Sequence, residues 1–209
     1  MISRSFGLIG AGLLMSLTAG PAIAADDRTC VAEAVEGDTA NYWNDGTWAE
    51  LREGQPLDPE SKVSTGGNTR VKITCDDGVV VTVGVETELN LEQLAGTAGR
   101  DRNVVLQLIS GIVGLVAPER TWSRFEVRTP VAIASVRSTE WLVEHAVAEG
   151  AAVFVRTGRV VVSLRDGRAF TLGDGEGITI SPGGVPGEVK TWGAPRIEQS
   201  TEALGFDWQ

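Results

Sequence analysis

The sequence predicts an all-β fold, and two observations carry that prediction. Short runs rich in valine, threonine and isoleucine are separated by Asp-Gly dipeptides, namely Asp45-Gly46, Asp77-Gly78, Asp166-Gly167 and Asp174-Gly175. Asp-Gly between such runs is typical of tight β-hairpins. Helical character is confined to residues 85–95 and 195–204. We therefore expect a single domain of short antiparallel strands, arranged as a sandwich or as a solenoid.

Residues 1–24 have the composition of a secretory signal peptide. Arg4 supplies a positive start, residues 6–17 are apolar, and residues 21–24 end in an Ala-x-Ala site. The apolar stretch is shorter than the ~20 residues that a spanning helix needs. We expect cleavage after Ala24, no membrane insertion afterwards, and a periplasmic or secreted bacterial protein; an uncleaved anchor is the alternative.

The rest of the chain is long enough for one sizeable domain. We place this domain at residues 25–181 and a Pro/Gly linker with a C-terminal tail at residues 182–209. The net charge of the whole chain is −10. An acidic exported protein repels nucleic acid and anionic lipid, so neither is an expected partner.

Cys30 and Cys75 are the two cysteines of the sequence. A pair of cysteines in an oxidising compartment predicts a disulfide. A metal or redox role is the alternative, although the sequence shows no Cys-x-x-Cys spacing and no paired histidines.

The predicted strands follow one another along the chain. Residues 69–75 alternate between polar and apolar side chains, whereas residues 79–83 are almost continuous valine, which is typical of a strand buried on both faces. Residues 85–91 also alternate, which favours a strand over a helix there. Residues 154–162, split by Gly158, read as a further hairpin.

The stretch from residue 125 to residue 143 is the centre of the predicted domain. Pro130 lacks a backbone N–H, so it belongs at a strand start, an edge or a bend. Alternation beyond it predicts one face with Val131, Ile133, Ser135, Arg137, Thr139, Trp141 and Val143, and an opposite face beginning with small alanines. Arg137 interrupts the bulkier face and needs a carboxylate or carbonyl partner.

This stretch resembles the Thr-Pro…Val-Arg-Gly-Thr-x-Phe-x-Val signature of the FecR domain, the extracytoplasmic part of bacterial iron-signalling regulators. The matching residues are Thr129-Pro130 and Val136-Arg137-Ser138-Thr139-Glu140-Trp141-Leu142-Val143. Ser138 stands where the family has glycine, and Trp141 where it has phenylalanine. Further family elements follow in the same order between about residues 33 and 181, and they include Val35-Glu36-Gly37, Trp48-Ala49-Glu50-Leu51, Val63-Ser64-Thr65-Gly66, Leu108-Ile109-Ser110-Gly111, Gly158-Arg159-Val160 and Leu172-Gly173-Asp174-Gly175.

The resemblance implies a protein-interaction or signalling role at the cell envelope, with an envelope protein as the partner. In the full-length regulators the domain follows a membrane helix and passes a receptor signal to a sigma factor. A signal peptide is predicted here instead, so a stand-alone binding module is the expected form.

Catalysis finds little support in the sequence. His145 is the only histidine, and its place near a predicted strand end favours a solvated side chain. Glu140 and Glu144 form a carboxylate pair of the kind that acidic chains commonly offer. Asp76, Asp77 and residues 173–177 provide oxygen atoms, but their spacing is that of β-turns rather than a calcium loop. We expect no enzyme activity, no cofactor and no metal.

Two aromatic segments are candidate binding sites. Tyr42 and Trp43 are expected in a loop, where they would suit stacking on sugars or on a peptide, which makes a carbohydrate- or cell-wall-binding module the second hypothesis. Trp48 is expected in the core, with Trp43 either covering it or exposed. The second segment is a basic loop with Arg120, Trp122 and Arg124 as candidate contacts; its alternative is Trp122 folded back onto the core. These candidate residues are Arg120, Trp122, Arg124, Tyr42 and Trp43.

The tail carries apolar residues at Ile197, Leu204, Phe206 and Trp208. Such residues at a chain terminus either pack back on the domain or await a partner, and packing back is expected here.

Overall fold

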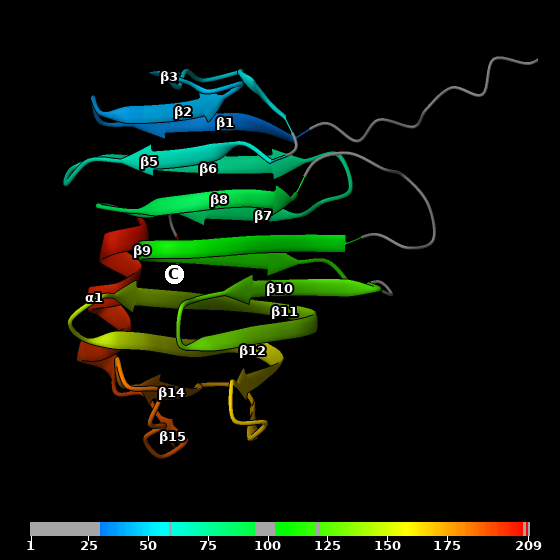
Figure 1. Ribbon diagram of the computed structural model, residues 1–209, viewed down its shortest axis with the longest axis vertical. Helices are drawn as coiled ribbons and strands as arrows, with labels where there is room; N and C mark the ends of the chain where they lie inside the picture. The colour runs from blue at the N-terminus through cyan, green and yellow to red at the C-terminus, as the bar shows by residue number, and fades with distance from the viewer. Residues whose placement is uncertain (1–29, 59, 95–102, 120–121, 207, 209) are drawn as a thin grey trace, which may run out of the picture.

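The computed structural model describes residues 30–58, 60–94, 103–119, 122–206 and 208, and only the backbone of Arg137 and Ser138. This part of the chain consists of strands and a single helix, α1 (Ala194–Leu204) (Figure 1). The all-β prediction is confirmed, and the helical character of residues 195–204 is realised in α1. No helix in the described ranges is long and apolar enough to cross a membrane.

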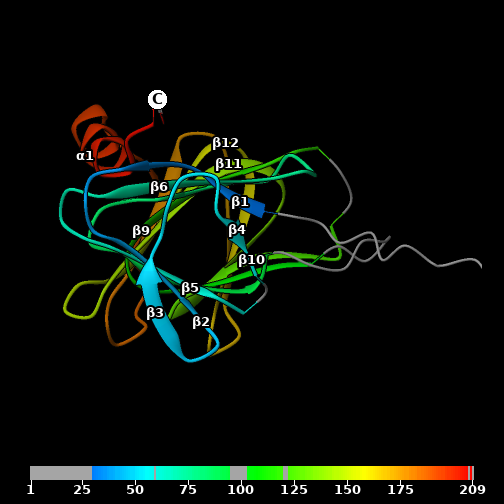
Figure 2. The same ribbon diagram turned by 90° about the horizontal axis from the view of Figure 1, so that it is seen from above.

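The strands lie in two layers that face each other (Figures 1 and 2). The front layer contains, in spatial order, β3 (Thr47–Glu50), β2 (Ala40–Asn44), β5 (Lys62–Thr65), β8 (Glu88–Gln93), the first half of β9 (Asn103–Ala117), β10 (Arg124–Arg128), the first half of β11 (Ala132–Ala146), the second half of β12 (Gly150–Leu164) and β13 (Ala169–Leu172). The back layer contains β4 (Pro56–Leu57), β1 (Cys30–Glu36), β6 (Arg70–Cys75), β7 (Val80–Val83), the other halves of β9, β11 and β12, then β14 (Glu176–Ile180) and β15 (Lys190–Thr191). These neighbours pair antiparallel, except that β9 and β10 are parallel.

The strands β9, β11 and β12 belong to both layers because each bends near its middle. Gly111 bends β9 with φ +93°, and Gly158 bends β12 with φ +104°. In β11, residues 137–138 lie opposite the single residue Arg159, which is a β-bulge. Each bend also exchanges which alternate residues face the interior. In β11 the interior receives Ala132, Ala134 and Val136 before the bulge, and Thr139, Trp141 and Val143 after it.

Two expectations for these strands are therefore wrong. Residues 154–162 are no hairpin, because Gly158 bends a continuous strand instead of reversing it. The alternate residues of 131–143 do not share one face either, since the bulge in β11 divides them. Ile133 consequently lies outside the core and is 39% exposed.

The main core fills the space between the layers. Its largest fully buried side chains include Trp141, Phe125, Ile73 and Leu106. Burying one such side chain stabilises the fold by about 1.5–3 kcal/mol. The four predicted Asp-Gly dipeptides lie in turns, and Val81, Thr82 and Val83 of β7 are buried on both faces as expected.

The predicted disulfide between Cys30 and Cys75 is confirmed. It joins residues that lie directly opposite each other on β1 and β6, with 4.0 Å between their Cα atoms. The tail also packs back on the domain: Leu204 and Trp208 join a second apolar cluster on the outer side of the back layer.

Candidate interaction face

The outer side of the front layer is the candidate functional site. Among the described elements α1 lies against the back layer, so the opposite side of the molecule carries no helical cover (Figure 2). One row of side chains crosses the front layer from β3 to β12, because strand register places them opposite one another. In order, the row is Trp48, Trp43, Lys62, Asn90, Gln107, Arg128, Ile133 and Ser163. We call the surface centred on this row the front face.

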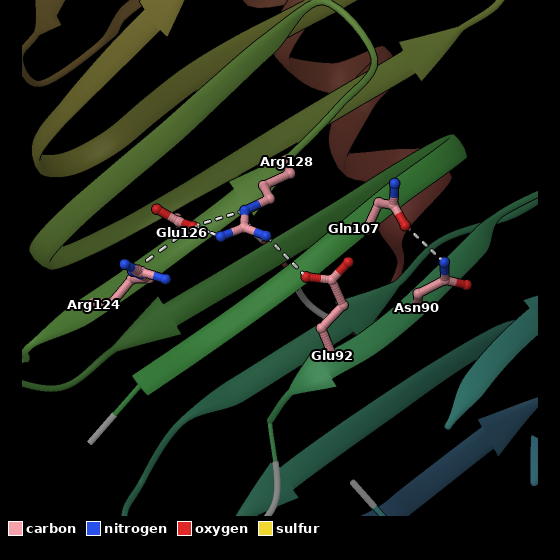
Figure 3. Close-up of polar contacts among 6 residues, drawn as sticks. All are labelled: Asn90, Glu92, Gln107, Arg124, Glu126 and Arg128. Atoms are coloured by element: carbon pink, nitrogen blue, oxygen red, sulfur yellow. Dashed lines mark hydrogen bonds and ion pairs between the residues drawn. The ribbon is translucent and has the colours of Figure 1, made fainter. Parts of the chain in front are cut away.

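Ion pairs occupy the middle of the front face (Figure 3). The Arg128 guanidinium donates to Glu126 Oε1 through Nε at 2.8 Å and pairs with Glu92 Oε2 through Nη1 at 3.1 Å. Arg124 Nε lies 4.0 Å from Glu126, and its side chain remains 52% exposed. Of the two arginines in this network, Arg124 is thus the less constrained, and its charge remains available to a partner.

A groove of about 440 Å³ lies beside these pairs. Lys62, Asn90, Arg124 and Arg128 are among its lining residues. Asn90 Nδ2 donates to Gln107 Oε1 at 2.9 Å, while the buried Oδ1 of Asn90 accepts no hydrogen bond from any described residue.

Two tryptophans form the other end of the row. Trp43 and Trp48 are cross-strand partners on the β2–β3 hairpin, whose turn residues Asp45 and Gly46 both have positive φ. Lys62 Nζ lies 4.8 Å from the centroid of the Trp43 ring, which is a cation–π contact. The prediction that Trp48 is buried is wrong: it is 48% exposed, because β3 is an edge strand of the front layer.

Tyr42 and Trp43 lie on strand β2 rather than in the expected loop, and they point to opposite faces of it. Tyr42 is buried and donates its hydroxyl hydrogen to Asp58 Oδ2 at 2.9 Å. Burial is the main reason why the pKa of Tyr42 is raised. Only Trp43 of this pair reaches the front face, where Trp48 joins it.

The second predicted segment is divided in the same way. Trp122 is buried, with its ring edge-to-face against Phe125 at 4.9 Å and its Nε1 donating to Pro118. This is the alternative placement, folded onto the core, and it leaves little of the ring for a partner. Arg124 lies on the front face, and Arg120 falls outside the described residues.

Two of the signature residues, Thr129 and Thr139, shape the ends of the first half of β11 through their hydroxyl groups. Thr129 Oγ1 accepts from the backbone N–H of Ala132 at 3.0 Å and so closes the turn that contains Pro130, between β10 and β11. Thr139 Oγ1 donates to the Arg159 carbonyl at 3.1 Å and holds the bulge. Arg137 and Ser138 lie in that bulge.

The remaining candidate residues make hydrogen bonds to the backbone that hold the fold together. His145 is buried, contrary to the expected solvation, and its Nδ1 lies 2.6 Å from the Ile109 carbonyl oxygen. Asp174 Oδ1 accepts from the Gly158 N–H at 2.6 Å, and Glu176 accepts from Gly173, as in a tight turn. Within the described ranges no group of three His, Cys, Asp or Glu side chains is placed to hold a metal ion.

Most of the front face escaped the sequence reasoning. Its missed residues are Lys62, Asn90, Glu92, Gln107, Glu126 and Arg128. They come from four strands that are distant in the sequence, so no local motif joins them. The sequence feature that could have revealed them is the polar residue at every second position in Asn90-x-Glu92 and in Arg124-x-Glu126-x-Arg128. Such alternation marks the outward side of a strand.

Comparison with known proteins adds a family match and two similar folds. Residues 61–174, more than half of the chain, match the family model described as FecR protein. Two crystal structures of a proposed anti-sigma factor from Parabacteroides distasonis ATCC 8503 superpose with TM-scores of 0.54 and 0.53 at 22% and 23% identity. Each comparison covers 65% of this chain and 62% of the other, so the likeness shows the shared fold. A search among curated proteins gave no match.

Proposed function

The chain belongs to the FecR protein family, and from this premise we propose that it is a non-catalytic protein-interaction module that serves signalling at the bacterial cell envelope. Its front face supports the proposal. It carries arginines and tryptophans, which are enriched in protein–protein interfaces, beside ion pairs and amides of the kind that form a polar rim. The partner is an envelope protein, and the predicted signal peptide is the route by which the chain reaches it.

The front face suits a partner whose charges alternate. Arg124, Glu126, Arg128 and Glu92 alternate in sign across β10 and β8, and Ile133 supplies an exposed apolar contact beside them. Complementary charges on a partner would fix its register, and burial of Ile133 would add affinity. Arg124 is the residue whose charge reversal should weaken binding most.

The test is site-specific crosslinking in the native envelope. A photoreactive residue replaces Ile133 on the front face, and a matched one replaces Val185, which is also exposed but lies in the turn after β14. The proposal expects one envelope protein to be crosslinked from position 133, to be absent from position 185, and to be lost on Arg124→Glu. Equal products from both positions would reject the front face as the binding surface.

Export is tested separately. A mature mass and an N-terminus that begins at residue 25 are expected from the envelope fraction. An intact N-terminus retained in the membrane fraction would show that residues 1–24 act as an anchor.

Glycan binding is a second candidate because the Trp43–Trp48 pair lies on the same surface, with Trp48 exposed. Exposed tryptophans commonly stack on sugar rings. A shift in tryptophan fluorescence on adding cell-wall fragments, abolished by Trp48→Ala and kept in Tyr42→Phe, would support it. An unchanged spectrum would remove this candidate while leaving the crosslinking result intact.

A further inference from the structure

The outer side of the back layer holds a socket for one helix. Its apolar walls are Ile112, Leu142, Ala152 and Phe154, and Leu204 and Trp208 pack in the same cluster. The helix α1 lies over the outer side of the back layer (Figure 2). We call the wall residues, together with Gly114, the α1 socket. Leu204 is fully buried there, so the socket is a second, separate surface from the front face.

The floor of the socket is shaped for large side chains. A Cβ on Gly114 would lie 2.7 Å from the Trp208 ring and 2.9 Å from Leu204 Cδ1, closer than carbon atoms approach. Trp192 stacks on Phe154 with ring centroids 4.9 Å apart. Because Gly114 has no side chain, Trp208 can pack directly against the sheet.

By itself, α1 is a poor helix. It has 11 residues, and its N-cap, Gly193, offers no side-chain hydrogen bond. Its first turn has no acidic residue and its last turn no basic one; Arg196 and Glu202 instead stand against the helix dipole. A helix this short is marginal in water even with favourable caps.

The sheet supplies what α1 lacks. Arg70 on β6 donates to the last helical carbonyls, from Nε to Ala203 at 3.1 Å and from Nη2 to Glu202 at 2.8 Å. Glu144 on β11 pairs with Arg196 and accepts from the Ser200 hydroxyl at 2.7 Å. A basic group at the C-terminus and an acidic group near the first turn are the compensation that a helix dipole requires.

We propose that the α1 socket is a binding site for a short amphipathic helix, that residues 194–206 and Trp208 take up their positions only on this site, and that the occupant can be exchanged for the same segment supplied in trans. The ligand class is a helix with apolar residues at the spacing of Ile197 and Leu204, a hydroxyl at the position of Ser200 that donates to Glu144, and a large aromatic residue after the helix. Recognition combines the apolar floor with Arg70 at the carbonyl end, which is helix-in-groove binding.

Hydrogen exchange on the intact protein tests the folding claim. Amides of α1 should exchange at least about a hundredfold faster than the buried amides of β9 and β11, because the segment opens alone. Arg70→Met should speed exchange in α1 by a further tenfold or more, as expected for losing hydrogen bonds to a charged group. Lys72→Met removes the same charge two residues along β6, where it pairs with Glu33, and should leave α1 unchanged.

Exchange in trans tests the binding claim. A protease site inserted between Gly193 and Ala194 is cut after the full chain has folded. The freed segment should remain bound on gel filtration and should be displaced by excess synthetic peptide 194–209, but not by its Leu204→Asp version. Loss of the segment without rebinding of peptide, or α1 amides that exchange only together with the sheet, would overturn the proposal.

Discussion

At the scale of single residues, the pKa of Tyr42 reports the burial of its hydroxyl group. It is the only tyrosine in the chain, and burial, ahead of its contacts with Asp58, raises its pKa above the ordinary value of 10.0. The unfolded chain therefore loses this proton first as the pH rises. The contribution of the protonated Tyr42 hydroxyl to the free energy of unfolding is complete below pH 10.0. This contribution is lost as the pH rises through the folded-state pKa of Tyr42.

Absorbance of tyrosinate during an alkaline titration measures this pKa without interference from a second tyrosine. The folded protein should show a midpoint above that of the same chain in denaturant. Coincident midpoints would mean that the Tyr42 hydroxyl is solvated.

Thr139 is the buried polar residue of the signature whose loss should be felt directly at the bulge. It is buried, and its hydroxyl bonds both the carbonyl and the N–H of Arg159 at the β11 bulge. Thr139→Val keeps the shape but leaves these groups without a partner, which should lower the free energy of unfolding by about 1–3 kcal/mol. Urea denaturation measures the loss, and Thr171→Val, at an exposed position on β13, should change it little.

At the scale of elements, the bends of β9, β11 and β12 decide the architecture. Gly111 has φ +93°, and a Cβ there would lie 2.5 Å from Thr87 Cα and 2.7 Å from the Glu86 carbonyl oxygen. Gly111→Ala should therefore lower the free energy of unfolding by at least about 2 kcal/mol, from backbone strain together with the clash. Thermal denaturation provides the measurement.

Gly183→Ala is the matched control for Gly111. The nearest atom to its added Cβ is Ser181 Oγ at 3.8 Å, so the stability should change by less than about 0.5 kcal/mol. Equal losses at both glycines would show that the bend of β9 does not depend on a residue without a side chain.

The bends also explain what sequence reasoning could and could not find. Alternation identified β6 and β8, and Asp-Gly identified the turns, because both signals are local. The bulge at residues 137–138 leaves a period of two on either side, so the pattern alone cannot show that the faces are exchanged. The same limit hid the front face, since Lys62 and Arg128 meet only through the register of the strands between them.

At the scale of the whole molecule, the disulfide ties the first described strand to the body of the back layer. Cys30 and Cys75 are separated by 45 positions, and their bond restricts the unfolded chain. Replacing both by serine should lower the free energy of unfolding by about 2–4 kcal/mol. Guanidinium denaturation of the variant, beside the oxidised parent, measures this loss; identical midpoints would contradict it.

The sharing of β9, β11 and β12 between the layers has a consequence for how the domain can change over evolution. In a true repeat array each unit contacts only its neighbours, so a unit can be duplicated or deleted while the rest survives. Here each of the three strands completes two layers at once, so deleting any one of them removes the middle of both. The domain is therefore indivisible: it can vary at its outer strands, such as β3 and β15, but it cannot be lengthened or shortened by whole repeats.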